Sequence, residues 1–219
     1  LMPGASGVPI PSPNTRRTMP DSSPPPPLPP RSVIGILGSG QLGKMLAQSA
    51  SRLGFRTHVY SDDAGPAFDV ATQHSVGSFT SFGRLDEFAR NVDVVTYEFE
   101  NVPVAAAEQL ALSVPVRPGA IALAVSQDRI SEKTFVRDLG IAVAPFVVVA
   151  APQDLGPAAD AQRSWGTAAI LKTARLGYDG KGQAVIQNPG DLAVAFGGLG
   201  SVPCVLERRL GFICEVSVL

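Results

Sequence analysis

The chain has 219 residues, of which 45% are hydrophobic and 17% are charged, so it can bury a core and its composition does not indicate overall disorder. The 18 lysines and arginines nearly balance 19 aspartates and glutamates, which excludes the strongly basic field of a nucleic-acid binder. Cys204 and Cys214 are too few for a disulfide scaffold and lack the spacing of a zinc site. With no apolar run long enough to cross a bilayer, we expect a soluble, cytoplasmic protein with neither a nucleic acid nor a membrane as a partner.

The amino-terminal segment, residues 1–31, is rich in proline and includes the run PPPPLPP at residues 24–30. It lacks the basic and apolar stretches of a secretory signal. A solvated polyproline extension is the commonest form of such a segment, so we expect a disordered tail.

The next part of the chain alternates strand and helix patterns. Residues 33–37 form a short apolar run typical of a buried parallel strand, and apolar residues at helical spacing predict a helix over 41–53. Strand patterns return at 57–60 and, after a second cycle, at 92–98. This order predicts an α/β fold in which residues 32–125 form a Rossmann-like domain with a parallel sheet.

The pattern then changes to that of a small α+β unit. Ser131 is placed to cap a helix that runs through Leu139. The remaining predicted elements are strands at 146–149, 169–172, 183–186 and 203–207, and helices near 154–164 and 190–197. We assign residues 126–206 to this unit and expect 207–219 to begin a further subdomain, because the last five residues resemble a strand entering more protein.

Two glycine-rich segments suggest phosphate binding. The first glycine loop, residues 38–43, has the pattern GxGxxG between a strand and a helix, and Asp62 follows the next strand. The helix amino terminus offers unpaired N–H groups to a phosphate, so this loop is compatible with NAD. Glycines that serve only strand-to-helix packing are the alternative.

The second glycine loop, residues 177–182, follows a strand that ends at Lys172. Three glycines would let the backbone fold onto phosphate oxygens, while Lys172 and Lys181 would neutralise charge on a transferring phosphoryl group. An ordinary β-hairpin is an equally good interpretation of this loop alone, because Asp-Gly is a strong turn signal. Glu207 and Glu215 add carboxylates suited to an adenine amino group and to ribose hydroxyls, although a lone glutamate is more often a solvated charge.

Four motifs together resemble one family. They are GSGQLGKM at 38–45, TYEFENVP at 96–103, Asp128-Arg129 with Lys133, and the stretch 172–182. In this order they resemble the N5-carboxyaminoimidazole ribonucleotide synthetases of the ATP-grasp superfamily. The resemblance implies an ATP-dependent ligase of purine biosynthesis, which converts 5-aminoimidazole ribonucleotide, ATP and bicarbonate into N5-carboxyaminoimidazole ribonucleotide, ADP and phosphate.

The resemblance also implies site residues. Arg129 and Lys172 are the expected catalytic cations. The implied ATP contacts are Arg129, Lys172, Gly177, Tyr178, Asp179, Gly180, Lys181, Gly182, Gln183, Glu207, Arg208, Arg209, Leu210 and Glu215. The first glycine loop, through Gly40, Gln41 and Leu42, would hold the phosphate of the imidazole nucleotide, and Glu98 and Asn101 would contact the same substrate. A helix-capping Asn101 and a solvated Glu98 are the alternatives.

The family's Mg²⁺ ligands, a glutamate and a glutamate-x-asparagine pair, have no counterpart before Leu219, so we expect a truncated ATP-grasp domain and no metal ligands in this chain. ATP and Mg²⁺ are the implied cofactors, and a homodimer is the implied assembly of the complete protein. Arg175 and Leu176 depart from the smaller residues of some relatives. Two other functions stay open: a non-catalytic nucleotide-binding fragment, and an NAD-dependent oxidoreductase.

Overall fold

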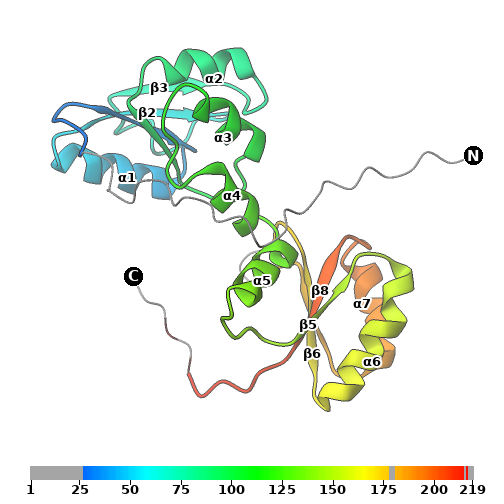
Figure 1. The fold of residues 1–219 in the computed structure, drawn as a ribbon. Coiled ribbons are helices and arrows are strands. Elements are labelled where there is room, and N and C mark those ends of the chain that lie inside the picture. The colour runs from blue at the N-terminus through cyan, green and yellow to red at the C-terminus, as the bar shows by residue number, and fades with distance from the viewer. Residues whose placement is uncertain (1–26, 178–180, 215, 217–219) are drawn as a thin grey trace, which may run out of the picture.

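The computed structural model describes residues 27–177, 181–214 and 216. Two domains follow one another along the chain, and α4 (Ala120–Ser126) and α5 (Arg129–Asp138) run between them (Figure 1). Four residues of the predicted ATP site, Tyr178, Asp179, Gly180 and Glu215, lie outside the described residues, as does most of the predicted terminal strand. None of the described helices has both the length and the apolar character that crossing a membrane requires.

The first domain is the predicted parallel sheet. Its strands are β1 (Val33–Leu37), β2 (Arg56–Ser61), β3 (Gln73–Val76) and β4 (Val94–Tyr97), all parallel, in the order β3-β2-β1-β4. Its helices are α1 (Gln41–Arg52), α2 (Phe82–Ala89) and α3 (Val104–Ala111). Side chains such as Phe88 and Leu110 bury one face of the sheet, and Ile36 and Ala47 bury the other. Both faces are covered, as expected for a parallel sheet.

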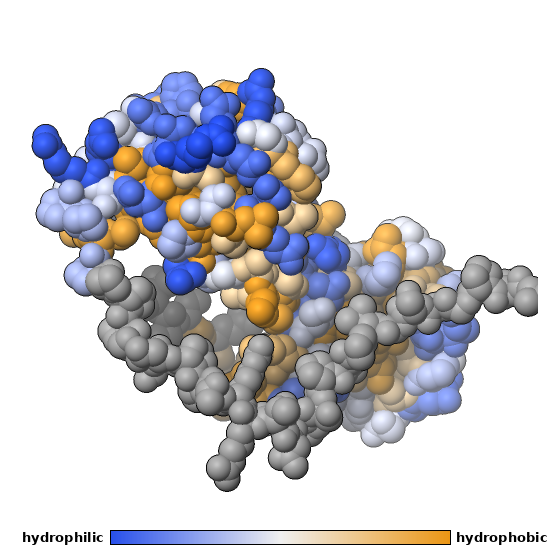
Figure 2. All heavy atoms as spheres, turned by 45° about the horizontal axis from the view of Figure 1, so that its top comes forward, coloured by the Kyte–Doolittle hydropathy of each residue, from blue (hydrophilic) through white to orange (hydrophobic). Residues whose placement is uncertain are grey.

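Helix α1 begins and ends close to its predicted bounds, but it presents small residues to the sheet. Gly43, Ala47 and Ala50 are buried, whereas the large apolar side chains that marked the helix, Leu42, Met45, Leu46 and Leu53, are 40% to 73% exposed. A Cβ at Gly43 would lie 2.8 Å from the carbonyl oxygen of Gly38, so close helix packing excludes a larger residue there. Apolar side chains accordingly reach the surface of this domain among hydrophilic ones (Figure 2).

The second domain is an antiparallel sheet with helices on its faces. Its strands are β5 (Phe146–Val149), β6 (Ala169–Thr173), β7 (Gln183–Ile186) and β8 (Cys204–Arg208), in the order β5-β8-β6-β7. The short helices η1 (Pro152–Asp154) and η2 (Pro189–Asp191) lead into α6 (Leu155–Trp165) and α7 (Leu192–Gly198), which pack on one face, and α5 lies on the other (Figure 1). All four predicted strands are present within one residue of their expected bounds.

The core of this domain lies between the sheet and α6 and α7, with Leu171, Leu206 and Phe196 at its centre. Cys204 is fully buried in the same core, and burial raises the pKa of its thiol. We therefore interpret Cys204 as a packing residue and not as a nucleophile.

Helix α5 begins two residues before the predicted cap. Asp128, in an extended conformation, accepts hydrogen bonds at Oδ1 from the backbone N–H groups of Ile130 and Ser131, each 3.0 Å long. Ser131 is thus inside the helix and donates through its backbone. Asp128 was recognised only as part of a family motif, and its side chain serves the start of the helix.

A buried glutamine links the two domains. Gln127 donates through Nε2 to the carbonyl oxygen of Val102, and its Oε1 accepts a 2.7 Å hydrogen bond from Arg175. The backbone N–H of Arg129 donates to the carbonyl oxygen of Ala174 over 2.8 Å. The loop after β4 and the loop after β6, far apart in sequence, are therefore tied to the same turn between α4 and α5.

We predict that Asp128→Ala lowers the free energy of unfolding by about 1 kcal/mol, because it removes the acceptor for two orphan N–H groups. The matched change Ser131→Ala should stay within about 0.5 kcal/mol of the original chain, since its side chain does not cap the helix. Urea denaturation followed by circular dichroism measures both. A larger loss for Ser131→Ala would contradict the assigned cap.

Candidate functional site

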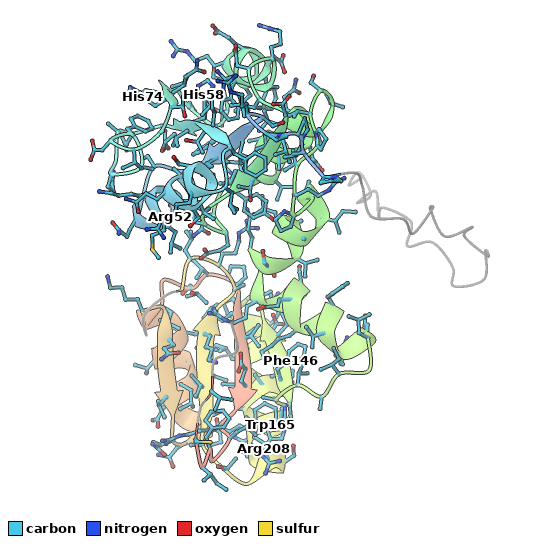
Figure 3. All side chains as sticks on the ribbon, turned by 90° about the vertical axis from the view of Figure 1, so that its left-hand side faces the viewer. Arg52, His58, His74, Phe146, Trp165 and Arg208 are labelled. Carbon is cyan, nitrogen blue, oxygen red and sulfur yellow. The ribbon has the colours of Figure 1, made fainter. Side chains whose placement is uncertain are left out.

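The most extensive gathering of predicted site residues lies around a cavity of about 600 Å³ in the second domain. Its walls come from β6, β8 and the segment after β8. Five predicted ATP contacts line it: Lys172, Glu207, Arg208, Arg209 and Leu210. Figure 3 shows Arg208 at the end of the sheet, where β8 leaves it. The volume falls in the range of roughly 300–1,000 Å³ that is usual for small-molecule sites.

A carboxylate between two ammonium groups forms the polar centre of this cavity. Lys172 Nζ lies 3.0 Å from Glu207 Oε2, and Lys133 Nζ, from α5, lies 3.4 Å from Glu207 Oε1. The side chain of Glu207 is only 8% exposed. A buried carboxylate is costly unless it is paired, so both lysines stabilise it. Glu207 is not the solvated charge of the alternative interpretation.

Strand pairing explains why these side chains meet. In the antiparallel ladders, Glu207 of β8 pairs with Ile170 of β6 on one side and with Phe146 of β5 on the other. Lys172 is two residues beyond Ile170, and side chains two residues apart on a strand point to the same face of the sheet. The face that carries Glu207 therefore also carries Lys172 and Phe146.

Arg129 lies beside the second glycine loop and donates hydrogen bonds to backbone carbonyl groups at its start. Its Nη1 donates to the carbonyl oxygen of Thr173 over 2.6 Å, and its Nη2 reaches the carbonyl oxygen of Gly177 at 3.5 Å. A guanidinium has five N–H donors, more than these two carbonyls need. Arg129 therefore orients the loop and retains donors for a phosphate.

The second glycine loop requires a glycine at residue 182, directly before β7. Gly182 has a φ of +69°, and a Cβ there would lie 2.6 Å from Thr173 Oγ1. Gln183, a predicted ATP contact, begins β7 and pairs with Lys172 in the ladder. Lys181 directly precedes Gly182. The strands on either side of the loop, β6 and β7, are antiparallel neighbours, and the described ends of the loop lie against Arg129 and Thr173.

Backbone N–H groups of the first glycine loop bind a carboxylate of the protein itself, that of Glu98. Glu98 Oε1 accepts a 2.7 Å hydrogen bond from the backbone N–H of Gly40, and Glu98 Oε2 accepts one from that of Gly43. A carboxylate is favoured there by the partial positive charge of the helix terminus. Glu98 thus takes up the N–H group of Gly40 at which a phosphate is expected, and the assignment of the imidazole nucleotide to this loop stays a prediction. Gln41 and Leu42 open α1 beside it, both exposed.

Asn101 does not cap a helix. It lies in the exposed loop after β4, where its Nδ2 is 3.3 Å from Glu100 Oε1, and α3 begins only at Val104 after Pro103. The capping alternative for Asn101 is therefore wrong. The loop brings Asn101 to the carboxyl end of β4, on the same edge of the sheet as the first glycine loop.

A second hollow, of about 560 Å³, lies in the first domain between the edge strand β3 and α2, and the sequence did not point to it. His58 and His74 line it (Figure 3). His58 Nε2 lies 2.8 Å from Ser75 Oγ, and its ring meets Phe88 edge-on at 4.8 Å. Burial, and to a lesser extent the charge of His74, lowers the pKa of His58. A neutral, packed histidine accounts for this geometry.

Metal ligands do not gather in the described part of the chain. Among those residues, no three side chains of histidine, cysteine, aspartate or glutamate come together. Glu207, the carboxylate in the cavity, is already paired with two cations. The described residues therefore do not fit a Mg²⁺ site.

Two family models match consecutive parts of the chain. The ribonucleotide synthetase preATP-grasp domain matches residues 32–127, and the ATP-grasp domain matches residues 134–219. Among curated proteins, the N5-carboxyaminoimidazole ribonucleotide synthase of Brucella melitensis is 44% identical over 195 residues, which are 88% of this chain and 53% of that protein. The bifunctional purine synthesis protein purC/E of Dictyostelium discoideum is 43% identical over 197 residues, 20% of its length.

Solved structures show the same relationship. The N5-carboxyaminoimidazole synthetase of Staphylococcus aureus, complexed with ADP, has a TM-score of 0.77 and 35% identity over 84% of this chain and 48% of that one. The synthase of Aspergillus clavatus, in complex with ADP and 5-aminoimidazole ribonucleotide, has a TM-score of 0.73 and 28% identity over the same shares. The chain spans about half the length of the synthases that it matches. It belongs to the ATP-grasp superfamily and, within it, to the family of N5-carboxyaminoimidazole ribonucleotide synthetases.

Proposed function

We propose that this chain supplies the nucleotide-binding parts of an ATP-dependent ligase that carboxylates 5-aminoimidazole ribonucleotide with bicarbonate. The products are N5-carboxyaminoimidazole ribonucleotide, ADP and phosphate, in purine biosynthesis. The observation that carries the proposal is the cavity in which Lys172 and Glu207 lie beside the segment after β8, in a chain of this family. Because the chain spans about half of its relatives, the activity is proposed for the protein expressed from the complete coding sequence.

We assign the parts of the chain as follows. Residues 32–125 bind the imidazole nucleotide, residues 126–206 form the small subdomain of the ATP grasp, and residues 207–219 begin its large subdomain. Residues 1–31 are a tail outside the catalytic unit. The two matching family models divide the chain at a similar point, between residues 127 and 134, which supports this division.

ATP would enter the cavity with its adenine against Glu207, Arg208, Arg209 and Leu210. The segment after β8 lines the cavity, and its course is fixed because the backbone N–H groups of Arg208 and Arg209 donate to the carbonyl oxygens of Pro145 and Ala168. The phosphates would lie toward Lys172 and Arg129 and under the second glycine loop, and Glu215 would accept the ribose hydroxyls. The buried pairing of Lys172 and the loop contacts of Arg129 support this orientation, because both cations are fixed by neighbouring groups.

In the proposed reaction, a bicarbonate oxygen attacks the γ-phosphorus of ATP, the bond to the β-phosphate oxygen breaks, and carboxyphosphate and ADP form. Charge spreads over the transferring oxygens, and Lys172 and Arg129 are the cations placed to stabilise it. The described residues do not form a metal site, and the Mg²⁺ that accompanies ATP would be held by residues outside them.

Carboxyphosphate hydrolyses readily, so the site has to exclude water until the exocyclic amine of the imidazole nucleotide takes up the carboxyl carbon. The second glycine loop would cover the phosphates for this purpose. The described ends of this loop lie against Arg129 and Thr173. A nucleotide phosphate that shifts the Arg129 side chain would therefore also shift the loop, because Arg129 donates to the carbonyl oxygen of Gly177.

We place the imidazole nucleotide at the first glycine loop, against Gly40, Gln41, Leu42, Glu98 and Asn101. Since the carboxylate of Glu98 takes the N–H groups of Gly40 and Gly43, a phosphate at the same point would meet a like charge. We therefore propose that the hydroxyl or amine donors of the nucleotide face Glu98, and that its phosphate lies elsewhere. The same geometry disfavours the pyrophosphate of NAD at this loop.

The assembly and location belong to the same proposal. We propose a homodimer and a cytoplasmic location, as the family resemblance implies, with small-molecule substrates as the other partners. A non-catalytic nucleotide-binding role is the second candidate for the 219 residues taken alone, because the described part of the chain has an ATP-sized cavity and no metal site.

ATP consumption by the protein from the complete coding sequence tests the function directly. We expect ADP release to require both 5-aminoimidazole ribonucleotide and bicarbonate, because carboxyphosphate has to form and then be captured. A coupled assay for ADP with each substrate omitted in turn measures this. ADP release that is indifferent to both substrates would overturn the proposed reaction.

We expect Lys172→Met to lower ATP turnover by about 10²–10³-fold at saturating substrates, because a cation at the transferring phosphoryl group is lost. Steady-state kinetics with thermal unfolding as a control measures the effect, since Glu207 also loses a partner. An unchanged turnover number in a folded variant would show that Lys172 does not take part in the reaction.

We also predict that NADH does not bind. Its pyrophosphate would have to displace Glu98 from the helix terminus. Titration of the protein into NADH, followed by nicotinamide fluorescence, should show no saturable change, whereas an ATP titration followed by calorimetry should. Saturable NADH binding would instead favour the oxidoreductase.

A further inference from the structure

We propose that Lys133 is a positioning residue for adenine recognition: it holds the Glu207 carboxylate in the orientation in which it accepts a hydrogen bond from the 6-amino group of ATP. The inference rests on the proposed ATP site and adds to it a residue on α5, outside the sheet and the loops that form the cavity.

The position of Lys133 follows from the helix. Arg129 and Lys133 are four residues apart on α5, so they share one face of it. Arg129 reaches the second glycine loop, and Lys133, one turn later, reaches Glu207. A single helix face thus supplies one cation to the phosphate side of the cavity and one to its carboxylate.

An aromatic ring holds Lys133 in place. Its Nζ lies 5.4 Å from the centre of the Phe146 ring, and Phe146 is the cross-strand partner of Glu207 on β5. Figure 3 shows Phe146 beside α5. An ammonium group between an aromatic face and a carboxylate has little freedom to turn away, and its side chain is only 15% exposed.

The carboxylate of Glu207 has unused hydrogen-bond acceptor capacity. Its Oε2 accepts a hydrogen bond from Lys172, whereas Oε1 is buried and, among the described residues, makes no hydrogen bond. The 3.4 Å approach of Lys133 to Oε1 is an ion pair without hydrogen-bond geometry. A carboxylate has about four acceptor positions, and Glu207 fills few of them, so the side of Glu207 that lines the cavity is suited to a donor supplied by a ligand.

The two lysines then have different tasks. In the proposed reaction Lys172 is shared between the phosphates and Glu207. Lys133 has no phosphate within its reach in this assignment and stays with the carboxylate. Without Lys133, the carboxylate would follow Lys172 or rotate, and its acceptor would no longer face the adenine.

The test compares ATP with purine riboside triphosphate, which carries hydrogen in place of the 6-amino group. Dissociation constants for both are measured by calorimetry on the protein from the complete coding sequence. We expect Lys133→Met to weaken ATP binding about tenfold and to leave the analogue nearly unchanged, so that the preference for ATP is lost. Lys133→Arg should restore most of the preference.

Arg137→Met is the matched control. Arg137 lies on the same helix with its guanidinium 5.6 Å from the same Phe146 ring, but it pairs with Asp138. We expect its preference for ATP to equal that of the original protein. Should Lys133→Met fail to fold, Lys133→Gln removes the charge with less disturbance, and the same loss of preference is expected.

The outcomes separate the inference from the function on which it rests. Equal weakening of ATP and of the analogue in the Lys133 variants would make the lysine a structural ion-pair partner only and would overturn the inference. Undiminished ATP preference in Lys133→Met would also overturn it. An original protein that binds neither nucleotide would overturn the proposed function itself, and the positioning role with it.

Discussion

The second domain depends on the neutralisation of one buried carboxylate. Glu207 lies on the central strand β8, and taking its charge out of water is unfavourable unless cations accompany it. Lys172 approaches from the neighbouring strand and Lys133 from α5 on the face of the sheet. Because each lysine comes from a different element, the ion-pair cluster fixes the helix against the sheet. Lys172 and Glu207 of this cluster also line the cavity that we assign to ATP.

The turn between α4 and α5 extends this arrangement to the first domain. Gln127 joins the loop after β4 to Arg175, and Arg129 holds the carbonyl oxygens at the end of β6. The proposed substrate loop and the proposed phosphate loop therefore share one buried connection. Arg175 takes part in it through a side-chain hydrogen bond that a smaller residue could not make.

Local sequence patterns predicted most helices and strands, but they did not predict which residues of a helix face the sheet. The apolar runs predicted the four strands of the second sheet within one residue and β1, β2 and β4 within about two, because a strand is defined by a few consecutive side chains. Strand β3 was not predicted, since its residues Gln73–Val76 include only one apolar side chain. The pattern of α1 predicted its length, but the residues that face the sheet are small, since a Cβ at Gly43 would already lie 2.8 Å from the carbonyl oxygen of Gly38. Ser131 looked like a cap, yet capping depends on which residue is extended, and that residue is Asp128.

By itself, the sequence determined the order of strands and helices, the two glycine-rich loops and the family, because each depends on residues close together in the chain. Only the tertiary structure decided which charges meet. Glu98 lies 58 residues from Gly40, and Glu207 lies 35 residues from Lys172. Contacts at such separations follow from strand pairing and helix packing, which no local spacing encodes. For that reason the carboxylate at the first glycine loop, and the lysine pair around Glu207, became visible only in the fold.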